Sequence, residues 1–265
     1  MNILFSKYNA NGNDFILIQA KHLPKEECTP KLISKLCNRN LGIGANGIIL
    51  ITESKKYDFL INYYNSDGSW ETFCANGSRC AAKHMMKLQQ KFDFIFKTGA
   101  GSHSCKISPL GSVVMDMVIP KYEFKEKNIL GHCGAAIDSG ARHFVAPISP
   151  LDKISTLKIG KSIRNADCFK PRGINVNLYK IKNRHTVEII TYEKGVEEVV
   201  MSCSSGSAAV VYHLAKNNLI QSPIKTISPG GNLSFSFDKN WSSFYCEGPT
   251  KYCFTGTFNL MDYSN

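Results

Sequence analysis

Two short segments of this 265-residue chain echo each other, and both begin with a cysteine. Residues 74–84 read C-A-N-G-S-R-C-A-A-K-H, and residues 203–213 read C-S-S-G-S-A-A-V-V-Y-H. Cys74 and Cys203 each stand where a loop enters a predicted helix. First-turn N–H groups and the positive end of the helix dipole lie at such a junction. This environment lowers the pKa of a thiol and binds a carboxylate, so the sequence predicts one activated thiol in each block.

Two such thiols predict proton transfer at a carbon atom. A thiolate on one face removes the α-proton of an amino acid, a thiol on the other face delivers a proton, and the configuration inverts. The substrate carboxylate, held at the helix N-termini, accepts negative charge as the carbanion develops. The two thiols are expected to titrate as a coupled pair, because only the state with one proton between them is productive.

The elements that must position these thiols are mostly short strands. Strand candidates with turn signals between them lie at residues 15–18, 48–51, 59–61, 113–119 and 187–192. Thr29 and Pro30 predict the start of a helix, and two more helices are predicted near Cys74 and Cys203. This balance predicts an α+β fold dominated by strands, and the echoed blocks predict two similar halves of about 120–130 residues.

Composition argues against several classes of protein. The net charge of +11 comes from scattered Lys and Arg residues, which indicates a solvated surface and no nucleic-acid partner. No apolar run reaches the roughly 20 residues that cross a bilayer, and no signal-peptide pattern precedes the first strand, so we expect a cytoplasmic protein without a membrane partner. Ten cysteines form no C-x-x-C pair, so we expect no metal site and expect most of them to be small buried hydrophobes.

The chain resembles the diaminopimelate epimerases, a family of pyridoxal-independent amino-acid epimerases. The resembling motifs are N-G-N-D-F at 11–15, C-N-R-N-L-G-I-G at 37–44, N-S-D-G-S at 65–69, C-A-N-G-S-R-C at 74–80, G-I-N-V-N at 173–177, Y-E-K-G at 192–195, C-S-S-G-S at 203–207, P-G-G-N-L at 229–233 and G-P at 248–249. Each motif alone is weak, but together they extend in family order over nearly the whole chain.

The resemblance implies two pseudo-symmetric domains, each a β-barrel-like sheet around a central helix, with the active site in the cleft between them. We expect the first domain at residues 1–118, to which a C-terminal strand at about 253–265 can return, and the second at 119–252. The implied reaction converts LL- to meso-diaminopimelate without a cofactor, in lysine and peptidoglycan precursor synthesis. The expected partner is a small amino-acid substrate, and a homodimer is left open.

The resemblance also implies roles for individual residues. Cys74 and Cys203 match the family's acid/base pair, and His143 and Glu193 match catalytic groups near the thiols. The positions that match substrate contacts are Asn11, Asn65, Ala75, Asn76, Asn175, Glu193, Lys194, Ser204 and Ser205.

Several positions depart from the family pattern. Ala75 and Ser204 replace glycines, Asn46 replaces an aspartate, and Lys194 replaces an arginine. Ala141-Arg142-His143 stands where the family has Asn-Pro-His. A lysine offers a point charge where arginine offers a planar fork, so we expect weaker recognition of the distal end of diaminopimelate.

Other interpretations stay open beside this one. An amino-acid racemase of the same fold with broader or different substrate specificity fits the altered distal pocket. The ten cysteines allow a redox-sensing or metal-binding thiol protein, and the positive charge allows a nucleic-acid binder. Within the echoed blocks, Cys80 is expected to pack in the core, and His84 and His213 are expected to be structural because they lie ten residues from the cysteines.

Overall fold

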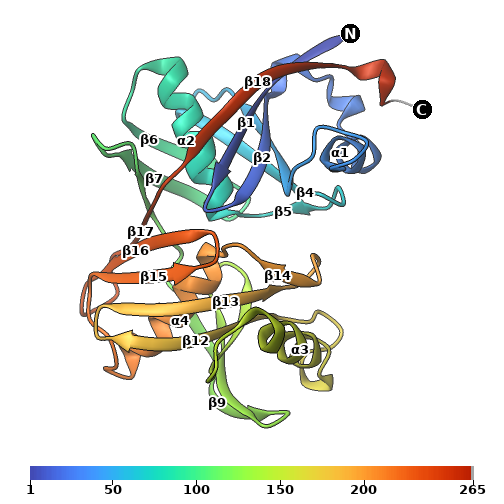
Figure 1. Cartoon of the computed structure of the whole chain (residues 1–265). Helices are drawn as coiled ribbons and strands as arrows, with labels where there is room; N and C mark the ends of the chain where they lie inside the picture. Colours follow the sequence, from blue (N-terminus) through green and yellow to red (C-terminus); the bar gives the residue numbers. More distant parts are fainter. Residues whose placement is uncertain (264–265) are drawn as a thin grey trace. The chain divides into compact units, whose positions relative to one another are not determined.

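A computed structural model describes residues 1–263 and shows an α+β chain built mostly from strands (Figure 1). The chain divides into two compact units. Unit 1 contains residues 1–115 and 248–263, and unit 2 contains residues 116–247. The fold class predicted from the sequence, α+β with strands dominant, is confirmed.

Unit 1 contains nine strands and two α-helices among the described residues. The strands are β1 (Asn2–Ala10), β2 (Asn13–Gln19), β3 (Gly47–Thr52), β4 (Phe59–Asn65), β5 (Trp70–Glu71), β6 (Asp93–Thr98), β7 (Gly101–Ile107), β8 (Val113–Asp116) and β18 (Lys251–Asn259). The helices are α1 (Pro30–Cys37) and α2 (Ala75–Gln89), with short 3₁₀ turns at Ala20–His22, Lys25–Glu27 and Leu260–Asp262. The late strand β18 returns to pair antiparallel with β1, the first strand of the chain.

Unit 2 is built from the middle of the chain. Its strands are β9 (Lys121–Ile129), β10 (His132–Asp138), β11 (Arg142–Pro147), β12 (Asn175–Asn183), β13 (Thr186–Glu193), β14 (Glu198–Val200), β15 (Ile224–Ser228), β16 (Gly231–Phe237) and β17 (Phe244–Gly248). Its helices are α3 (Lys153–Arg164) and α4 (Ser204–Lys216), with a 3₁₀ turn at Asp167–Phe169.

The strand pairings of unit 1 recur in the same order in unit 2. In unit 1, β1 pairs antiparallel with β2, β2 parallel with β3, β3 antiparallel with β4, and β4 parallel with β6. In unit 2 the corresponding pairs are β10 with β11, β11 with β12, β12 with β13, and β13 with β15. The helices α2 and α4 occupy equivalent places in this order, so the two echoed cysteine blocks belong to an internal repeat.

Each unit has one of these helices at its centre. Helix α2 packs against β1, β2, β3, β4 and β7, and α4 packs against β10, β11, β12 and β16 (Figure 1). A helix surrounded by strands must be apolar or small on most of its faces. The buried pairs Ala81-Ala82 on α2 and Ala208-Ala209 on α4 meet this need, because their small side chains let the strands approach closely.

Local sequence signals explain how these elements begin. The Thr29 side chain accepts a hydrogen bond from the Leu32 N–H at 3.2 Å, which confirms the predicted start of α1. Asn11 and Gly12 join β1 to β2 with φ of 53° and 79°, the positive values that a two-residue type I′ turn requires. Helix α3 was not among the predicted elements.

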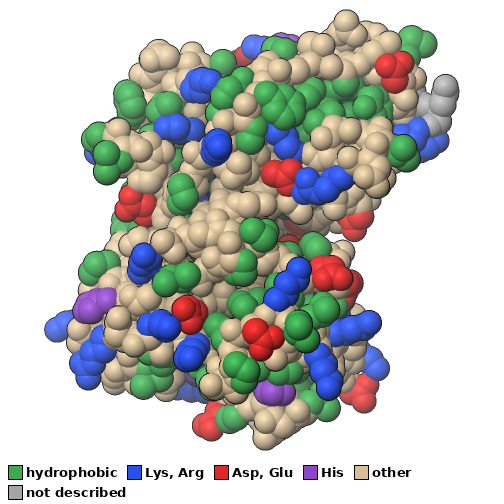
Figure 2. Space-filling view, viewed as in Figure 1, with side chains coloured by type: hydrophobic (Ala, Val, Ile, Leu, Met, Phe, Trp, Pro, Cys, Tyr) green, Lys and Arg blue, Asp and Glu red, His purple; other side chains and the backbone are tan. Residues whose placement is uncertain are grey.

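The positively charged side chains are spread over the surface and form no dense cluster on the face shown in Figure 2. Figure 2 shows Lys and Arg side chains scattered among acidic and apolar ones over the visible face, which matches the expectation of a solvated surface. Among the described residues, no helix is both long and apolar enough to cross a bilayer.

Candidate active site

Cys74 and Cys203 are the N-cap residues of α2 and α4. Their backbone angles are nearly the same, with φ of −137° and −130° and ψ of 109° and 108°. The Gly77 N–H donates to Cys74 Sγ at 3.4 Å, and the Gly206 N–H donates to Cys203 Sγ at 3.4 Å. Both thiols are half-buried. Each sulfur therefore lies beside the positive end of a central helix, as the sequence predicted.

The first turn of each helix carries the residues predicted to hold a carboxylate. Ala75 and Asn76 open α2, and Ser204 and Ser205 open α4. An α-helix leaves the N–H groups of its first turn without intrahelical acceptors, so these backbones can bind an anion. Ala75 lies in the helix with a negative φ, so its methyl group introduces no backbone strain there.

A buried arginine that the sequence analysis did not single out links two of the predicted substrate residues. Arg79 on α2 is fully buried, and its Nη2 donates to Asn76 Oδ1 at 2.6 Å and to Asn11 Oδ1 at 3.3 Å. The side chain therefore ties the β1–β2 turn to the first turn of α2. The sequence feature that could have indicated this role is a single charged residue within a helix segment of otherwise small, uncharged side chains.

Asn65 lies at the end of β4 and is held by its own hairpin. Its Oδ1 accepts from the Tyr63 hydroxyl at 2.8 Å, and its Nδ2 donates to Ser69 Oγ at 3.0 Å. The N-S-D-G-S motif thus forms a turn that orients the Asn65 amide.

The early glycine loop is supported by an ionic network of buried Lys7, partly buried Asp14 and exposed Arg39, which the sequence analysis did not predict. Lys7 Nζ contacts the Gly44 carbonyl and lies 2.7 Å from Asp14 Oδ2, while Arg39 Nη2 lies 2.6 Å from Asp14 Oδ1. Burial opposes ionisation of Asp14, but the hydrogen bonds from Arg39 and Lys7 outweigh it and lower the pKa of this carboxyl group. Asn46 Oδ1 accepts from the Asp14 N–H at 3.2 Å, so the amide at this position joins the same network.

In unit 2, Asn175 connects two of the altered positions. Its Nδ2 donates to the Arg142 carbonyl at 3.0 Å, and its Oδ1 accepts from the Lys194 N–H at 2.8 Å. Lys194 directly follows Glu193, the last residue of β13. Asn175, Glu193 and Lys194 are therefore brought together, as their assignment to one substrate-binding region requires.

The guanidinium of Arg142 is occupied by a neighbouring carboxylate. Its Nε and Nη2 donate to the two oxygens of Glu123 at 2.5 and 2.7 Å, and its Nη1 donates to the Gly173 carbonyl at 3.2 Å. This bidentate pairing lowers the pKa of Glu123. Arg142 thus links β11 to Glu123 on β9 within unit 2.

His143 is fully buried and reaches Cys203 through a serine. Its Nε2 lies 3.0 Å from Ser205 Oγ, which in turn lies 3.4 Å from Cys203 Sγ. Burial lowers the pKa of His143 to about 3, so the ring is neutral at physiological pH.

The other cysteines are more exposed than the sequence led us to expect. Only Cys37, Cys80, Cys105 and Cys246 are buried, so the expectation that most of the ten are buried hydrophobes is wrong. Cys80 does pack in the core, where burial raises its pKa strongly. Within residues 1–263, no group of three or more His, Cys, Asp or Glu side chains is arranged to hold a metal ion.

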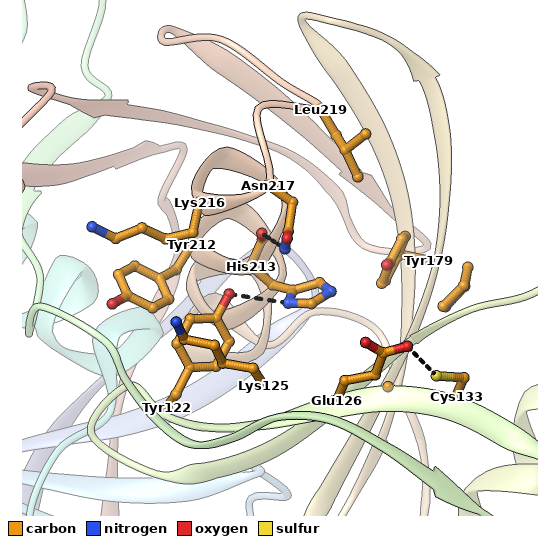
Figure 3. Close-up of a pocket in the computed structure, with 12 residues that line it drawn as sticks. Tyr122, Lys125, Glu126, Cys133, Tyr179, Tyr212, His213, Lys216, Asn217 and Leu219 are labelled. Carbon is orange, nitrogen blue, oxygen red and sulfur yellow. Dashed lines mark hydrogen bonds between the residues drawn. The ribbon is translucent and has the colours of Figure 1, made fainter.

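A cavity of about 700 Å³ lies in unit 2 at the other end of α4 (Figure 3). His213, Tyr122 and Tyr179 line it, and the Tyr122 hydroxyl lies 3.2 Å from His213 Nδ1. Ten residues of helix, about 15 Å at 1.5 Å per residue, separate His213 from Cys203. Burial lowers the pKa of His213 and raises the pKa values of both tyrosines to about 12, so these groups are neutral. Among the described lining residues, none is a predicted site residue.

Comparison with known sequences finds similarity to diaminopimelate epimerases. The family model described as diaminopimelate epimerase matches residues 5–122. A diaminopimelate epimerase from Campylobacter jejuni subsp. doylei is 34% identical over 262 residues, covering 97% of this chain and 99% of the relative. One from Chlorobaculum tepidum is 31% identical, covering 94% of this chain and 98% of the relative.

Solved structures share the fold at low sequence identity. A probable proline racemase from Agrobacterium radiobacter aligns with a TM-score of 0.77 at 12% identity, covering 98% of this chain and 95% of that one. A hydroxyproline epimerase from Agrobacterium vitis aligns with a TM-score of 0.75 at 11% identity, covering 97% of this chain and 92% of that one. At this level of identity the likeness concerns the fold alone.

Proposed function

Because this chain belongs to the diaminopimelate epimerase family and is an isomerase, we propose that it interconverts LL- and meso-diaminopimelate with Cys74 and Cys203 as its acid/base pair. The observation that carries this proposal is the shared geometry of the two cysteines. Each caps a central helix with the same backbone conformation and accepts one N–H bond from the third residue of that helix.

The proposed reaction needs no group beyond these side chains and the substrate. The thiolate of one cysteine takes the α-proton, and the thiol of the other gives its proton to the opposite face of the same carbon. One proton leaves the carbon and one reaches it, so the charge on the thiol pair is unchanged while the configuration inverts. The N–H groups that open α2 and α4, with the positive ends of their dipoles, would hold the α-carboxylate and stabilise the carbanion.

The remaining residues are proposed to orient the rest of the substrate. Asn11 and Asn65 in unit 1 and Asn175 and Glu193 in unit 2 offer amide and carboxylate groups to the amino-acid heads. Lys194 is proposed to attract the distal carboxylate as a point charge.

A racemase of broader or different substrate specificity is the second candidate, and the position of Arg142 favours it. Its guanidinium is held by Glu123 and the Gly173 carbonyl, so it does not simply replace the planar fork that Lys194 lacks. A site with fewer directional partners for the distal head penalises single-headed amino acids less.

Turnover with isotopic labelling tests the proposal. In deuterated water, LL-diaminopimelate is expected to yield meso-diaminopimelate carrying deuterium at the inverted α-carbon. Cys74→Ala and Cys203→Ala are each expected to abolish epimerisation, while Cys80→Ala, a buried thiol of the same helix α2, serves as the matched control. Substantial epimerisation by either active-site variant would contradict the two-thiol assignment.

We also propose that the reaction belongs to lysine and peptidoglycan precursor synthesis in the cytoplasm and that the protein acts as a homodimer. Sedimentation velocity at several concentrations tests the assembly, since a single monomer-sized species at all of them would refute it.

A further inference from the structure

A chain of hydrogen bonds runs behind Cys203 entirely within unit 2. Thr191 Oγ1 donates to Asn177 Oδ1 at 2.9 Å, and Asn177 Nδ2 lies 3.0 Å from His143 Nδ1. His143 Nε2 then contacts Ser205 Oγ at 3.0 Å, and Ser205 Oγ contacts Cys203 Sγ at 3.4 Å. Asn177 and His143 are fully buried and Thr191 is nearly so, so water does not compete for the contacts among these three residues, whereas Ser205 and Cys203 are half-buried.

The direction of the chain follows from the surroundings of Asn177. Its Nδ2 also lies 3.4 Å from the Phe144 carbonyl oxygen, which can only accept a hydrogen bond. The amide must therefore turn its NH₂ group to this side and its oxygen to Thr191. Since an NH₂ group only donates, His143 Nδ1 is the acceptor.

The tautomer of His143 then sets the direction of the bond between His143 and Ser205. A neutral imidazole carries one proton, and an Nδ1 that accepts leaves this proton on Nε2. The Nε2–H group donates to Ser205 Oγ. Ser205 then keeps its own hydroxyl proton, which can donate to Cys203 Sγ 3.4 Å away, the sulfur that also accepts from the Gly206 N–H.

We propose that Asn177 is a positioning residue that sets the tautomer of His143 and, through Ser205, directs a hydroxyl proton to Cys203 Sγ, so that Cys203 is held as the proton acceptor of the resting enzyme. The inference rests on the proposed role of Cys203 as an acid/base group. A sulfur that receives two hydrogen bonds is stabilised as the thiolate, because bonds to a charged acceptor are stronger than bonds to a neutral one.

Gly206 makes room for this arrangement. A Cβ added at Gly206 would lie 2.0 Å from Asn177 Oδ1, so the amide can approach the first turn of α4 only because residue 206 has no side chain. The close approach places Asn177 between the sheet and the helix that Cys203 caps.

The tautomer can be measured directly and without substrate. The nitrogen-15 chemical shifts of histidine-labelled protein distinguish an Nε2–H ring from an Nδ1–H ring, and His143→Gln assigns the His143 signals among the seven histidines. We expect Nε2–H in the wild-type protein. In Asn177→Asp, which keeps the size and the Thr191 bond, the carboxylate accepts from Nδ1, so we expect Nδ1–H. An Nδ1–H ring in the wild-type protein would overturn the inference even if the variant failed to fold.

Thiol reactivity tests the far end of the chain. In a Cys74→Ala background, the rate of Cys203 alkylation by iodoacetamide is followed against pH by peptide mass spectrometry. We expect Asn177→Asp and Ser205→Ala to move the midpoint of the alkylation pH profile up by about one unit, which slows alkylation about tenfold at pH values below the wild-type midpoint. Thr191→Val is the matched control, because it removes a buried hydrogen bond from Asn177 but leaves the Asn177–His143 bond, and less than threefold slowing is expected.

Equal slowing in Asn177→Asp and Thr191→Val, or none in Asn177→Asp, would show that Asn177 only packs and would refute its positioning role. Neither measurement uses turnover. A protein with the expected tautomer and reactivity but no epimerisation of diaminopimelate would therefore contradict the proposed function, while the direction of the hydrogen-bond chain and its effect on the Cys203 thiol would still be supported.

Discussion

Replacing Arg79 tests whether a buried cation organises the unit 1 part of the site. Its guanidinium donates to Asn76 at 2.6 Å and to Asn11 at 3.3 Å from within the protein interior. Hydrogen bonds to charged groups contribute roughly 1.5–3 kcal/mol each, and the longer bond lies at the low end. Removing the guanidinium also removes the cost of burying it, which offsets part of the loss. We expect Arg79→Met to lower the free energy of unfolding by about 2–3 kcal/mol.

The same change should weaken substrate binding more than it slows chemistry. A guanidinium has no acceptor, so it holds the oxygens of both amides toward itself and turns their NH₂ groups away. Once it is removed, Asn11 and Asn76 are able to rotate, and their donors are no longer preset for a carboxylate. We expect KM for diaminopimelate to rise about tenfold, equal to about 1.4 kcal/mol, with a smaller effect on kcat.

Urea unfolding and steady-state kinetics measure both effects. Arg79→Lys should recover part of each loss, because an ammonium is a point charge and reaches one amide better than two. Lys83→Met, on the same helix, is the matched control for loss of a positive charge. Wild-type stability and an unchanged KM in Arg79→Met would show that this side chain organises neither amide.

Three further predictions concern the distal pocket and acid stability. The double variant Ala141→Asn, Lys194→Arg should raise kcat/KM for diaminopimelate relative to glutamate. No turnover of glutamate by the wild type, together with an unchanged kcat/KM for diaminopimelate in the double variant, would refute the weakened recognition of the distal head. His143 has a folded-state pKa of about 3, below its unfolded value near 6.5. The free energy of unfolding should therefore fall by up to about 1.4 kcal/mol per pH unit as pH drops between these values. Urea unfolding curves at several pH values should show a weaker dependence of this free energy on pH in His143→Gln. Asp14 also has a lowered pKa, so its stabilising contribution should be lost progressively as pH falls below about 4, and the stability lost in Asp14→Asn at neutral pH should shrink as pH falls through this range.

Local sequence signals were enough to predict three of the four α-helices of the described chain, including the two that Cys74 and Cys203 cap. Thr29 and Pro30 marked α1, and the two cysteine blocks marked α2 and α4, because capping depends on a few adjacent residues. Helix α3 was missed although Asp152 caps it by accepting from the Ser155 N–H at 2.8 Å. Its place in unit 2, between β11 and β12, matches that of α1 between β2 and β3 in unit 1, so the internal repeat itself indicates a helix at this position.

The residues of the hydrogen-bond chain that reaches Cys203 could not be predicted from the sequence. Thr191 meets Asn177 because they lie opposite each other on antiparallel β12 and β13. His143 joins them through the parallel pairing of β11 with β12, which depends on a crossover through α3. Such contacts depend on sheet register, and no local spacing predicts which side chains the register will bring together.

The two helix starts resemble each other in their caps but differ in what supports them. Arg79 places a buried cation on α2 itself, whereas His143 and Asn177 reach α4 from the strands as neutral groups. A two-thiol reaction requires one sulfur to hold a proton while the other lacks it. Equivalent surroundings would give both thiols the same proton affinity, and unlike surroundings remove that equality. In the proposed two-thiol reaction, the internal repeat would supply the two thiols, and the residues that differ between the two halves would determine which sulfur holds the proton in the resting enzyme.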